Sequence, residues 1–473
     1  MFIGHEYELK ELEELYKEPG FQVAVVTGTR CSGKTTLLKE FTKDKKTLFF
    51  TAFETTGEQE ISLLSKYVSR LNGKDYSKLE DVTLLKLFDD IIDESSKERL
   101  VFVIDEYAAF ARADASFEGL FTTYLKERFV GSDILLIISG TRSSYFNKHC
   151  LGDYTPVGKF TEIKLGVESI NYMDALKYCK NADNYTRAIL YGITGGMPAL
   201  LSRYRDGETV KEFVIREYLD PSATYFALTQ DMLAFDLREL SYYNRMLGAI
   251  AHGLHRVNEI SAEVGKPKDV VVPYLNTLIS LGLVERTNPL TEETNRKKTR
   301  YMIINSYVEF YFRFVAPNLD MVYSGEADKL FDVKISPFLD LFMAGTFPKM
   351  CRDYLEKKCS EDSKDAFPFE IEKVGRWWQN AGEKEEAADF DLLAISDRAK
   401  KCTVYCSCIF GKNAVELITL KELIGMTTLL RRDGDVYYMV FAAGDFHQNT
   451  ITVASTIKNI VLVRLDELYT DIG

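Results

Sequence analysis

Long apolar runs are missing from this sequence of 473 residues. The longest runs, such as VAVVTG, LVFVI and ILLIIS, are far shorter than the roughly 20 residues of a membrane-spanning helix. The opening residues contain no basic segment followed by an apolar one, so no secretion signal is expected. These absences argue against a membrane protein built from helices, and they predict a cytoplasmic location.

Paired cysteine motifs are absent as well. Eight cysteines are scattered along the chain, and none of them forms a CxxC pair. Without a secretion signal, free thiols are expected rather than a framework of disulfides. Cys402, Cys406 and Cys408 cluster, and the last two would share one face of a strand. Because no histidine is near them, a packed strand face is favoured over a metal site.

An excess of basic residues is also absent, since the formal net charge is -12. This charge argues against a nucleic-acid scaffold that uses the whole surface, although a local basic patch is compatible with it. The content of 46% hydrophobic and 27% charged residues is that of a folded protein. The length is too great for one core and predicts about three domains.

Residues 28–35 read GTRCSGKT, a complete GxxxxGK[ST] phosphate-binding loop. The apolar run FQVAVV precedes it and the helix-like TLLKEFTK follows, which is the strand, loop and helix context that the motif requires. Lys34 is expected to reach the β- and γ-phosphates, and Thr35 to bind Mg²⁺. The predicted ATP-binding residues of this segment are Gly28, Thr29, Arg30, Cys31, Ser32, Gly33, Lys34, Thr35 and Thr36.

A second apolar strand ends in two adjacent carboxylates, in LVFVIDEYAAF at residues 100–110. Asp105 is expected to bind Mg²⁺ next to Thr35. Glu106 stands where many ATPases place the residue that orients or deprotonates the attacking water. The alternative is a buried strand followed by a solvated acidic turn.

A third strand, in DILLIISGTRSSYF at residues 133–146, ends in Ser139, Thr141 and Arg142. Ligands bind at the carboxyl edge of parallel sheets, so Ser139 or Thr141 is expected to sense the γ-phosphate. Arg142 is expected to stabilise its charge, although it could equally cap the next helix or pair with a surface acid. The predicted catalytic residues are thus Lys34, Glu106 and Arg142. The alternation of strands and helices predicts an α/β fold with a parallel sheet.

From about 241 to 305 the pattern indicates short helices followed by a basic hairpin, the order of a winged helix. Segment 268–281 would be the recognition helix. The predicted contacts to DNA phosphate lie in the wing and are Arg296, Lys297, Lys298 and Arg300. The segment VVVPYLNTLIS offers little that could read a base edge, so a regulatory or protein-contact role is the alternative.

The order of these motifs, together with YVEFYFRFVAPN at 307–318 and GRWW at 375–378, resembles the archaeal-type ATPases of the STAND and AAA+ group. The resemblance spans essentially the whole chain. It implies that the turn GGMP in a helical lid approaches the nucleotide through Pro198, with a plain turn between helices as the alternative. It also implies a carboxy-terminal domain with a PD-(D/E)xK nuclease-like fold, similar to restriction endonucleases.

The resemblance implies five regions. They are a P-loop ATPase core at 1–167, a helical lid at 168–235, a winged helix at 236–315, a helical connector at 316–345 and a nuclease-like domain at 346–473.

The nuclease motif of that family is incomplete in this sequence. Asp391 is retained, but Pro348 stands in place of the first acid, and Ser407 and Ile409 in place of Glu and Lys. One carboxylate is too few to hold a catalytic metal ion, so a non-cleaving domain is expected. Acids that could complete a displaced site are Glu370, Glu372 and Glu416.

The sequence therefore predicts an ATP-binding protein, a slow Mg²⁺-dependent ATPase that acts as a nucleotide-controlled switch and reports to a protein partner. Oligomers are compatible with this prediction. The alternatives are an ATP-dependent DNA-binding regulator that uses the winged helix, and an ATP-dependent nuclease.

Overall fold

The computed structural model describes residues 2–78, 82–114, 116–234, 237–359, 371–379, 387–396, 401–430 and 432–470. Its contacts divide the chain into two compact units. The first comprises Met1–Ile170 with the short segments Met197–Ala199 and Ser280–Gly282. The second comprises Asn171–Gly196, Leu200–Ile279 and Leu283–Gly473.

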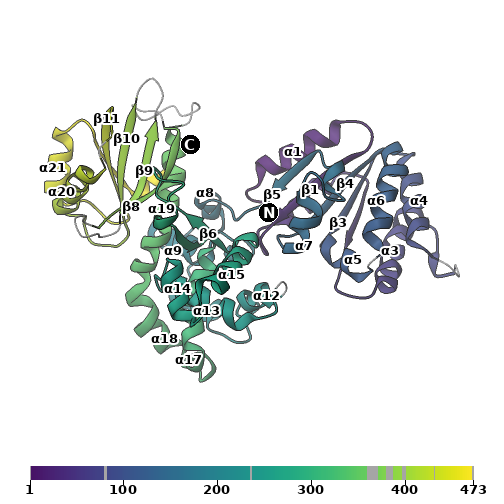
Figure 1. The fold of residues 1–473 in the computed structure, drawn as a ribbon, viewed down its shortest axis with the longest axis horizontal. Helices are drawn as coiled ribbons and strands as arrows, with labels where there is room; N and C mark the ends of the chain where they lie inside the picture. The colour runs from purple at the N-terminus through teal and green to yellow at the C-terminus, as the bar shows by residue number, and fades with distance from the viewer. Residues whose placement is uncertain are drawn as a thin grey trace. The chain divides into compact units, whose positions relative to one another are not determined.

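The first unit is built on a five-stranded sheet with the order β2-β3-β4-β1-β5, in which all neighbouring strands are parallel (Figure 1). The strands are β1 (Gln22–Gly28), β2 (Thr47–Thr51), β3 (Leu100–Asp105), β4 (Ile134–Thr141) and β5 (Ile163–Gly166). The central strands are almost continuously apolar because both of their faces are covered. The parallel sheet predicted from the sequence is confirmed.

Helices cover both faces of this sheet. α1 (Glu6–Lys17) and α2 (Lys34–Thr42) pack on one face, where Leu12 and Phe41 join the core formed by Ala24 and Val26 of β1. The other face takes α3 (Gly57–Asn72), α4 (Leu84–Ser95), α5 (Tyr107–Ala113) and α6 (Phe117–Glu127). Successive residues of a strand point to opposite faces, so each strand supplies both cores.

The second unit begins with short helices. They are α8 (Tyr172–Ala175), α9 (Asn184–Thr194), α11 (Val210–Tyr218), α12 (Leu228–Ala234), α13 (Leu240–Ala251), α14 (Val257–Val264) and α15 (Lys268–Ser280). An antiparallel hairpin of β6 (Val284–Thr287) and β7 (Arg300–Ile303) follows. The segment after the hairpin is helical and includes α16 (Ser306–Phe310), α17 (Leu319–Tyr323), α18 (Ala327–Leu330) and the long α19 (Leu339–Lys358).

A second five-stranded sheet, with the order β12-β11-β10-β9-β8, completes this unit. Its strands are β8 (Lys373–Gln379), β9 (Ala388–Ser396), β10 (Cys402–Ile409), β11 (Asp435–Ala442) and β12 (Ile460–Arg464). β8, β9 and β10 are antiparallel neighbours, whereas β10, β11 and β12 are parallel. The chain thus combines a parallel α/β core with a separate mixed α/β sheet, as the predicted fold class requires.

α19 and α20 (Leu417–Met426) cover opposite faces of the second sheet. Tyr354 of α19 meets Phe441 of β11 at 6.2 Å between ring centroids, while Leu420 of α20 packs with the neighbouring residue Val440. Adjacent strand residues face opposite ways, so the two helices lie on different sides. α21 (Gln448–Thr456) and α22 (Leu465–Thr470) follow.

Candidate nucleotide site

The phosphate-binding loop joins the end of β1 to the start of α2. Gly28 closes the strand, and a Cβ built on it would lie 2.0 Å from the Val167 carbonyl oxygen, so only glycine fits there. Cys31 and Gly33 have φ angles of 65° and 105°, the left-handed region that lets the loop curl back on itself. Lys34 is the first residue of α2, so the loop lies at the positive end of that helix.

The Lys34 ammonium is folded onto this loop. Its Nζ donates to the carbonyl oxygen of Thr29 at 2.7 Å and to that of Gly28 at 3.2 Å. Burial lowers the pKa of Lys34, and the negative charges of Glu106 and Asp105 oppose that shift. A phosphate in the loop would replace neutral carbonyl partners with a charged one, which forms stronger hydrogen bonds.

Thr35 and Asp105 meet although 70 residues separate them in the sequence. Thr35 Oγ1 donates to Asp105 Oδ2 at 3.0 Å, and Asp105 is only 2% exposed at the end of β3. A hydroxyl and a carboxylate at this spacing are oxygen ligands of the kind that Mg²⁺ takes in phosphate sites. The pairing of these two residues expected from the sequence is therefore present.

Glu106 is the next residue, and it is held by the neighbouring strand. Its backbone has a φ of 54°, and its Oε1 accepts a hydrogen bond from Thr141 Oγ1 at 3.2 Å. β4 lies between β1 and β3, and Thr141 stands opposite Gly28 in the register. The sheet order therefore brings the acid of one strand and the hydroxyl of another to the edge that carries the phosphate loop.

Ser139 and Arg142 differ in their surroundings. Ser139 is fully buried, and its Oγ has no hydrogen-bond partner among the described residues. The Arg142 backbone N–H braces the loop by donating to the Gly28 carbonyl at 2.9 Å. Its guanidinium forms an ion pair with the exposed Glu168, so Arg142 is paired with a surface acid. A catalytic role for Arg142 stays a prediction.

The remaining predicted ligands lie around the loop. Arg30 and Thr36 are exposed, Thr29 and Ser32 are buried, and burial raises the pKa of the Cys31 thiol. Pro198 belongs to the first unit, and a Cβ built on Gly33 would lie 3.7 Å from its Cγ. Pro198 thus lies close to the loop, although its contact with nucleotide remains a prediction.

The sequence did not reveal one neighbour of the loop, His5. Its Nε2 lies 3.0 Å from the carbonyl oxygen of Ser32. No motif or spacing links positions 5 and 32, so only the packing of α1 against α2 brings them together. The sequence offers only a local signal, the adjacent Gly4 and His5, which favour a turn before the first helix.

Two of the four basic residues predicted to contact DNA are used inside the second unit. Arg300 Nη1 lies 3.0 Å from Asp389 Oδ2, and Arg376 binds the same carboxylate through two nitrogens at 2.9 and 3.1 Å. Lys298 pairs with Glu292 at 2.6 Å. Arg296 and Lys297, in the short turn before β7, are exposed.

The two tryptophans of GRWW hold the hairpin loop 288–299 against β8. Trp378 Nε1 donates to the Lys298 carbonyl at 3.0 Å, and Trp377 Nε1 donates to Thr291 Oγ1 at 3.1 Å. Both indole side chains are buried. The Leu290 N–H donates to the carbonyl of residue 376 at 3.0 Å, so the loop covers the edge strand of the sheet.

Asp391 lies beside the cysteines of β10. Its Oδ2 accepts the Cys408 N–H at 2.7 Å, and burial raises its pKa while that hydrogen bond and the charge of Arg376 oppose the shift. Ser407 and Ile409 alternate with Cys406 and Cys408 and face the other side of β10. Neither face of β10 therefore supplies a carboxylate or a lysine.

The other acids that could complete a nuclease site are Glu370, Glu372 and Glu416. Glu372 and Glu416 are exposed, Glu370 falls outside the described residues, and Pro348 lies within α19. Across the described ranges, no group of three or more histidine, cysteine, aspartate or glutamate side chains is arranged to hold a metal ion. Absence of DNA cleavage stays the prediction.

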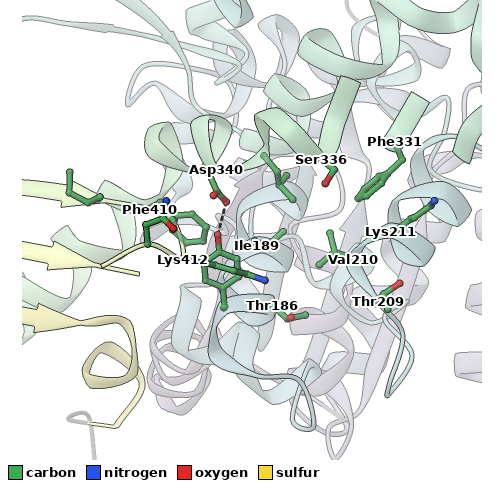
Figure 2. A pocket seen from close by; sticks show the side chains of 15 residues that line it. Thr186, Ile189, Thr209, Val210, Lys211, Phe331, Ser336, Asp340, Phe410 and Lys412 are labelled. Carbon is green, nitrogen blue, oxygen red and sulfur yellow. Dashed lines mark hydrogen bonds between the residues drawn. The ribbon is translucent and has the colours of Figure 1, made fainter. Parts of the chain in front are cut away.

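The second unit contains a cavity of about 660 Å³ between α9, the start of α11, α19 and the residues after β10 (Figure 2). Tyr185 donates to Asp340 at 2.5 Å, and Lys412 Nζ lies 5.1 Å from the centre of the Tyr185 ring. Lys211 is neutralised by Asp328 and Asp332. These charges do not converge on one class of ligand.

The loop, the Thr35–Asp105 pair and the parallel sheet define the first unit as a P-loop nucleotide-binding domain. Residues 2–203 match a family model described as an ATPase domain predominantly from Archaea. Residues 311–413 match a model described as archaeal and bacterial proteins of unknown function. The chain thus carries an ATP-binding ATPase domain that is similar to this archaeal family, followed by a region similar to other archaeal and bacterial proteins.

One relative along most of the chain is the uncharacterized protein MJECL04 of Methanocaldococcus jannaschii. It is 25% identical over 409 residues, which cover 85% of this chain and 86% of the relative.

Two solved structures are similar in fold. The Walker-type ATPase PABY2304 of Pyrococcus abyssi is 16% identical with a TM-score of 0.49, over 66% of this chain and 96% of that one. The ORC2 protein of Aeropyrum pernix, in its ADPNP-ADP complexes, is 15% identical with a TM-score of 0.44, over 71% of this chain and 97% of that one. Both TM-scores are below 0.5, so neither likeness carries functional information for this chain.

Within the described residues, every helix is too short or too polar to cross a membrane.

Proposed function

We propose that this protein is a slow, Mg²⁺-dependent ATPase that works as a nucleotide-controlled switch. One observation carries the proposal: Lys34, the Thr35–Asp105 pair and Glu106 converge at the same edge of the sheet, around a loop that ends at a helix N-terminus. These are the groups needed to bind a triphosphate, hold a metal ion and position an attacking water.

Each residue has a role that follows from its place. Lys34 would leave the carbonyls of Gly28 and Thr29 to bind the β- and γ-phosphates. Thr35 and Asp105 would hold Mg²⁺, which supplies charge neutralisation for the phosphates when bound. Glu106 would orient the water or accept its proton.

The switch part of the proposal rests on hydrogen bonds that a nucleotide would exchange. Lys34 donates to loop carbonyls and Glu106 accepts from Thr141. In the proposal, Lys34 exchanges these carbonyls for phosphate oxygens, and Glu106 exchanges Thr141 for the attacking water before hydrolysis. A protein whose two arrangements have different affinities for ATP and ADP changes its conformational population with the nucleotide. In this proposal, a partner protein senses the change. Trp377 and Trp378 are buried in contacts within the chain.

Glu106→Gln tests the proposed chemistry. We expect the variant to keep its affinity for ATP and to lower single-turnover hydrolysis by about 100-fold, because an amide cannot accept a proton. Calorimetry measures binding and quenched-flow measures hydrolysis. The control is Glu98→Gln, an exposed acid of the same unit. Hydrolysis at the parental rate in Glu106→Gln would assign Glu106 a structural role.

DNA binding is the second candidate function, and exposed Arg296 and Lys297 favour it. Replacing both by alanine should lower the salt dependence of DNA binding by about two counterions, because each residue would neutralise about one phosphate. Fluorescence anisotropy at several salt concentrations measures this slope. Replacing the exposed Lys39 and Lys43 removes the same charge elsewhere and serves as control. Equal slopes for the two double variants would leave the hairpin without a role in DNA binding.

A further inference from the structure

One side chain ties the beginning of α1 to the phosphate-binding loop. His5 Nε2 lies 3.0 Å from the Ser32 carbonyl oxygen. A Cβ built on Gly33 would lie 3.1 Å from the same nitrogen, so the imidazole packs directly against the loop. The His5 side chain is only 7% exposed, which shields this hydrogen bond from water.

The backbone on both sides of this contact is strained. Among the described residues other than glycine, three have a positive φ: His5 at 62°, Cys31 at 65° and Glu106 at 54°. All three lie at the nucleotide site. Such conformations persist where the surroundings hold them firmly, and they concentrate at functional sites. The hydrogen bond from His5 to Ser32 joins two of the strained segments.

His5 is itself held by a packed helix. Its carbonyl oxygen accepts the Leu9 N–H at 3.0 Å and so begins α1. Leu12 and Leu15 of α1 are buried in the same core as Leu37 of α2. The packing of α1 therefore fixes the backbone of His5, and this holds the imidazole in contact with Ser32.

We propose that His5 is a positioning residue for the phosphate-binding loop. The Ser32 carbonyl and the Gly33 N–H belong to one planar trans peptide group and point in opposite directions. By holding that carbonyl outward, His5 turns the Gly33 N–H toward the inside of the loop, where the β-phosphate binds. This inference rests on the proposed ATP site, and it predicts equal effects on ATP and ADP, which share the β-phosphate.

The test measures nucleotide affinity by calorimetry with Mg²⁺. His5→Ala should weaken ATP and ADP by the same factor, about fivefold to tenfold, as expected for one lost hydrogen bond. The kcat at saturating ATP should stay within about twofold of the parent, since the reacting groups remain. His5→Gln should recover affinity because its amide nitrogen can occupy the place of Nε2. His149→Ala, which removes a partner of Glu118 in the same unit, is the control.

Three outcomes would overturn the proposal. These are unchanged affinity for both nucleotides in folded His5→Ala, a loss confined to one of the two nucleotides, and equal affinities of His5→Gln and His5→Phe, which keeps a ring but has no donor. The last comparison decides the matter if the alanine variant does not fold. Failure of the parent protein to bind either nucleotide is a different result and would refute the proposed function itself.

Discussion

Replacing Lys34 by alanine should weaken ATP binding by about 100-fold or more, because the variant loses a charge-assisted contact to two phosphate groups. The fold should survive the change. Lys34 is buried, so folding removes part of the hydration of its charged group, and this loss lowers its pKa. Calorimetry with Mg²⁺ measures the affinity, and thermal unfolding measures the stability.

The sign of the stability effect follows from that pKa. A lysine whose pKa is lower in the folded than in the unfolded state destabilises the folded state at every pH below its unfolded-state pKa. Removing it in Lys34→Ala should therefore not lower the unfolding temperature. Lys39→Ala, at an exposed position of the same helix, is the matched control. Parental ATP affinity in a folded Lys34→Ala protein would refute the site.

Replacing Trp378 by alanine should lower the stability of the second unit by about 3 to 5 kcal/mol, the usual cost of removing a buried tryptophan. Trp378 is 1% exposed, donates to the Lys298 carbonyl and lies under the Arg300 guanidinium at 4.5 Å. The substitution would leave a cavity between β8 and the hairpin loop 288–299 and leave that carbonyl without its donor.

The measurement can use the protein's own fluorescence. The chain has two tryptophans, so Trp377 remains next to the altered contact as the reporter of chemical denaturation. Trp378→Phe keeps most of the volume but removes the N–H, and should cost about 1 kcal/mol beyond the lost area. Equal stability of the parent and Trp378→Ala would show that the hairpin loop is not fastened to the sheet through this residue.

Local sequence was sufficient for the features that are themselves local. The phosphate-binding loop follows from a glycine, Gly33, that adopts left-handed backbone, a lysine at the first helical position and a flanking apolar strand. The acids of β3 were found because strand and carboxylates are adjacent in sequence. The alternation of apolar strands with helices was sufficient for the α/β class, since only a covered parallel sheet buries such strands on both faces.

Apart from the pairing of Thr35 with Asp105, which the two motifs predicted, contacts between distant segments were beyond the sequence. The hydrogen bond from Thr141 to Glu106 depends on β4 lying between β1 and β3, and strand order leaves no mark in one sequence. The same holds for His5, whose partner is 27 residues away. The basic hairpin is the clearest example. Its positive charge was visible, but its neutralisation by Asp389 required β9 to pack beside it.

The sequence by itself determined that this protein has a P-loop, its acidic strand and a parallel α/β core, because these depend on short-range backbone preferences and hydrophobic periodicity. Only the tertiary structure decided which charges are available. Arg142 is paired with Glu168, Arg300 with Asp389, and Lys34 with carbonyls of its own loop. A charge is satisfied by whichever group the fold brings within a few ångströms, and that distance is set by packing.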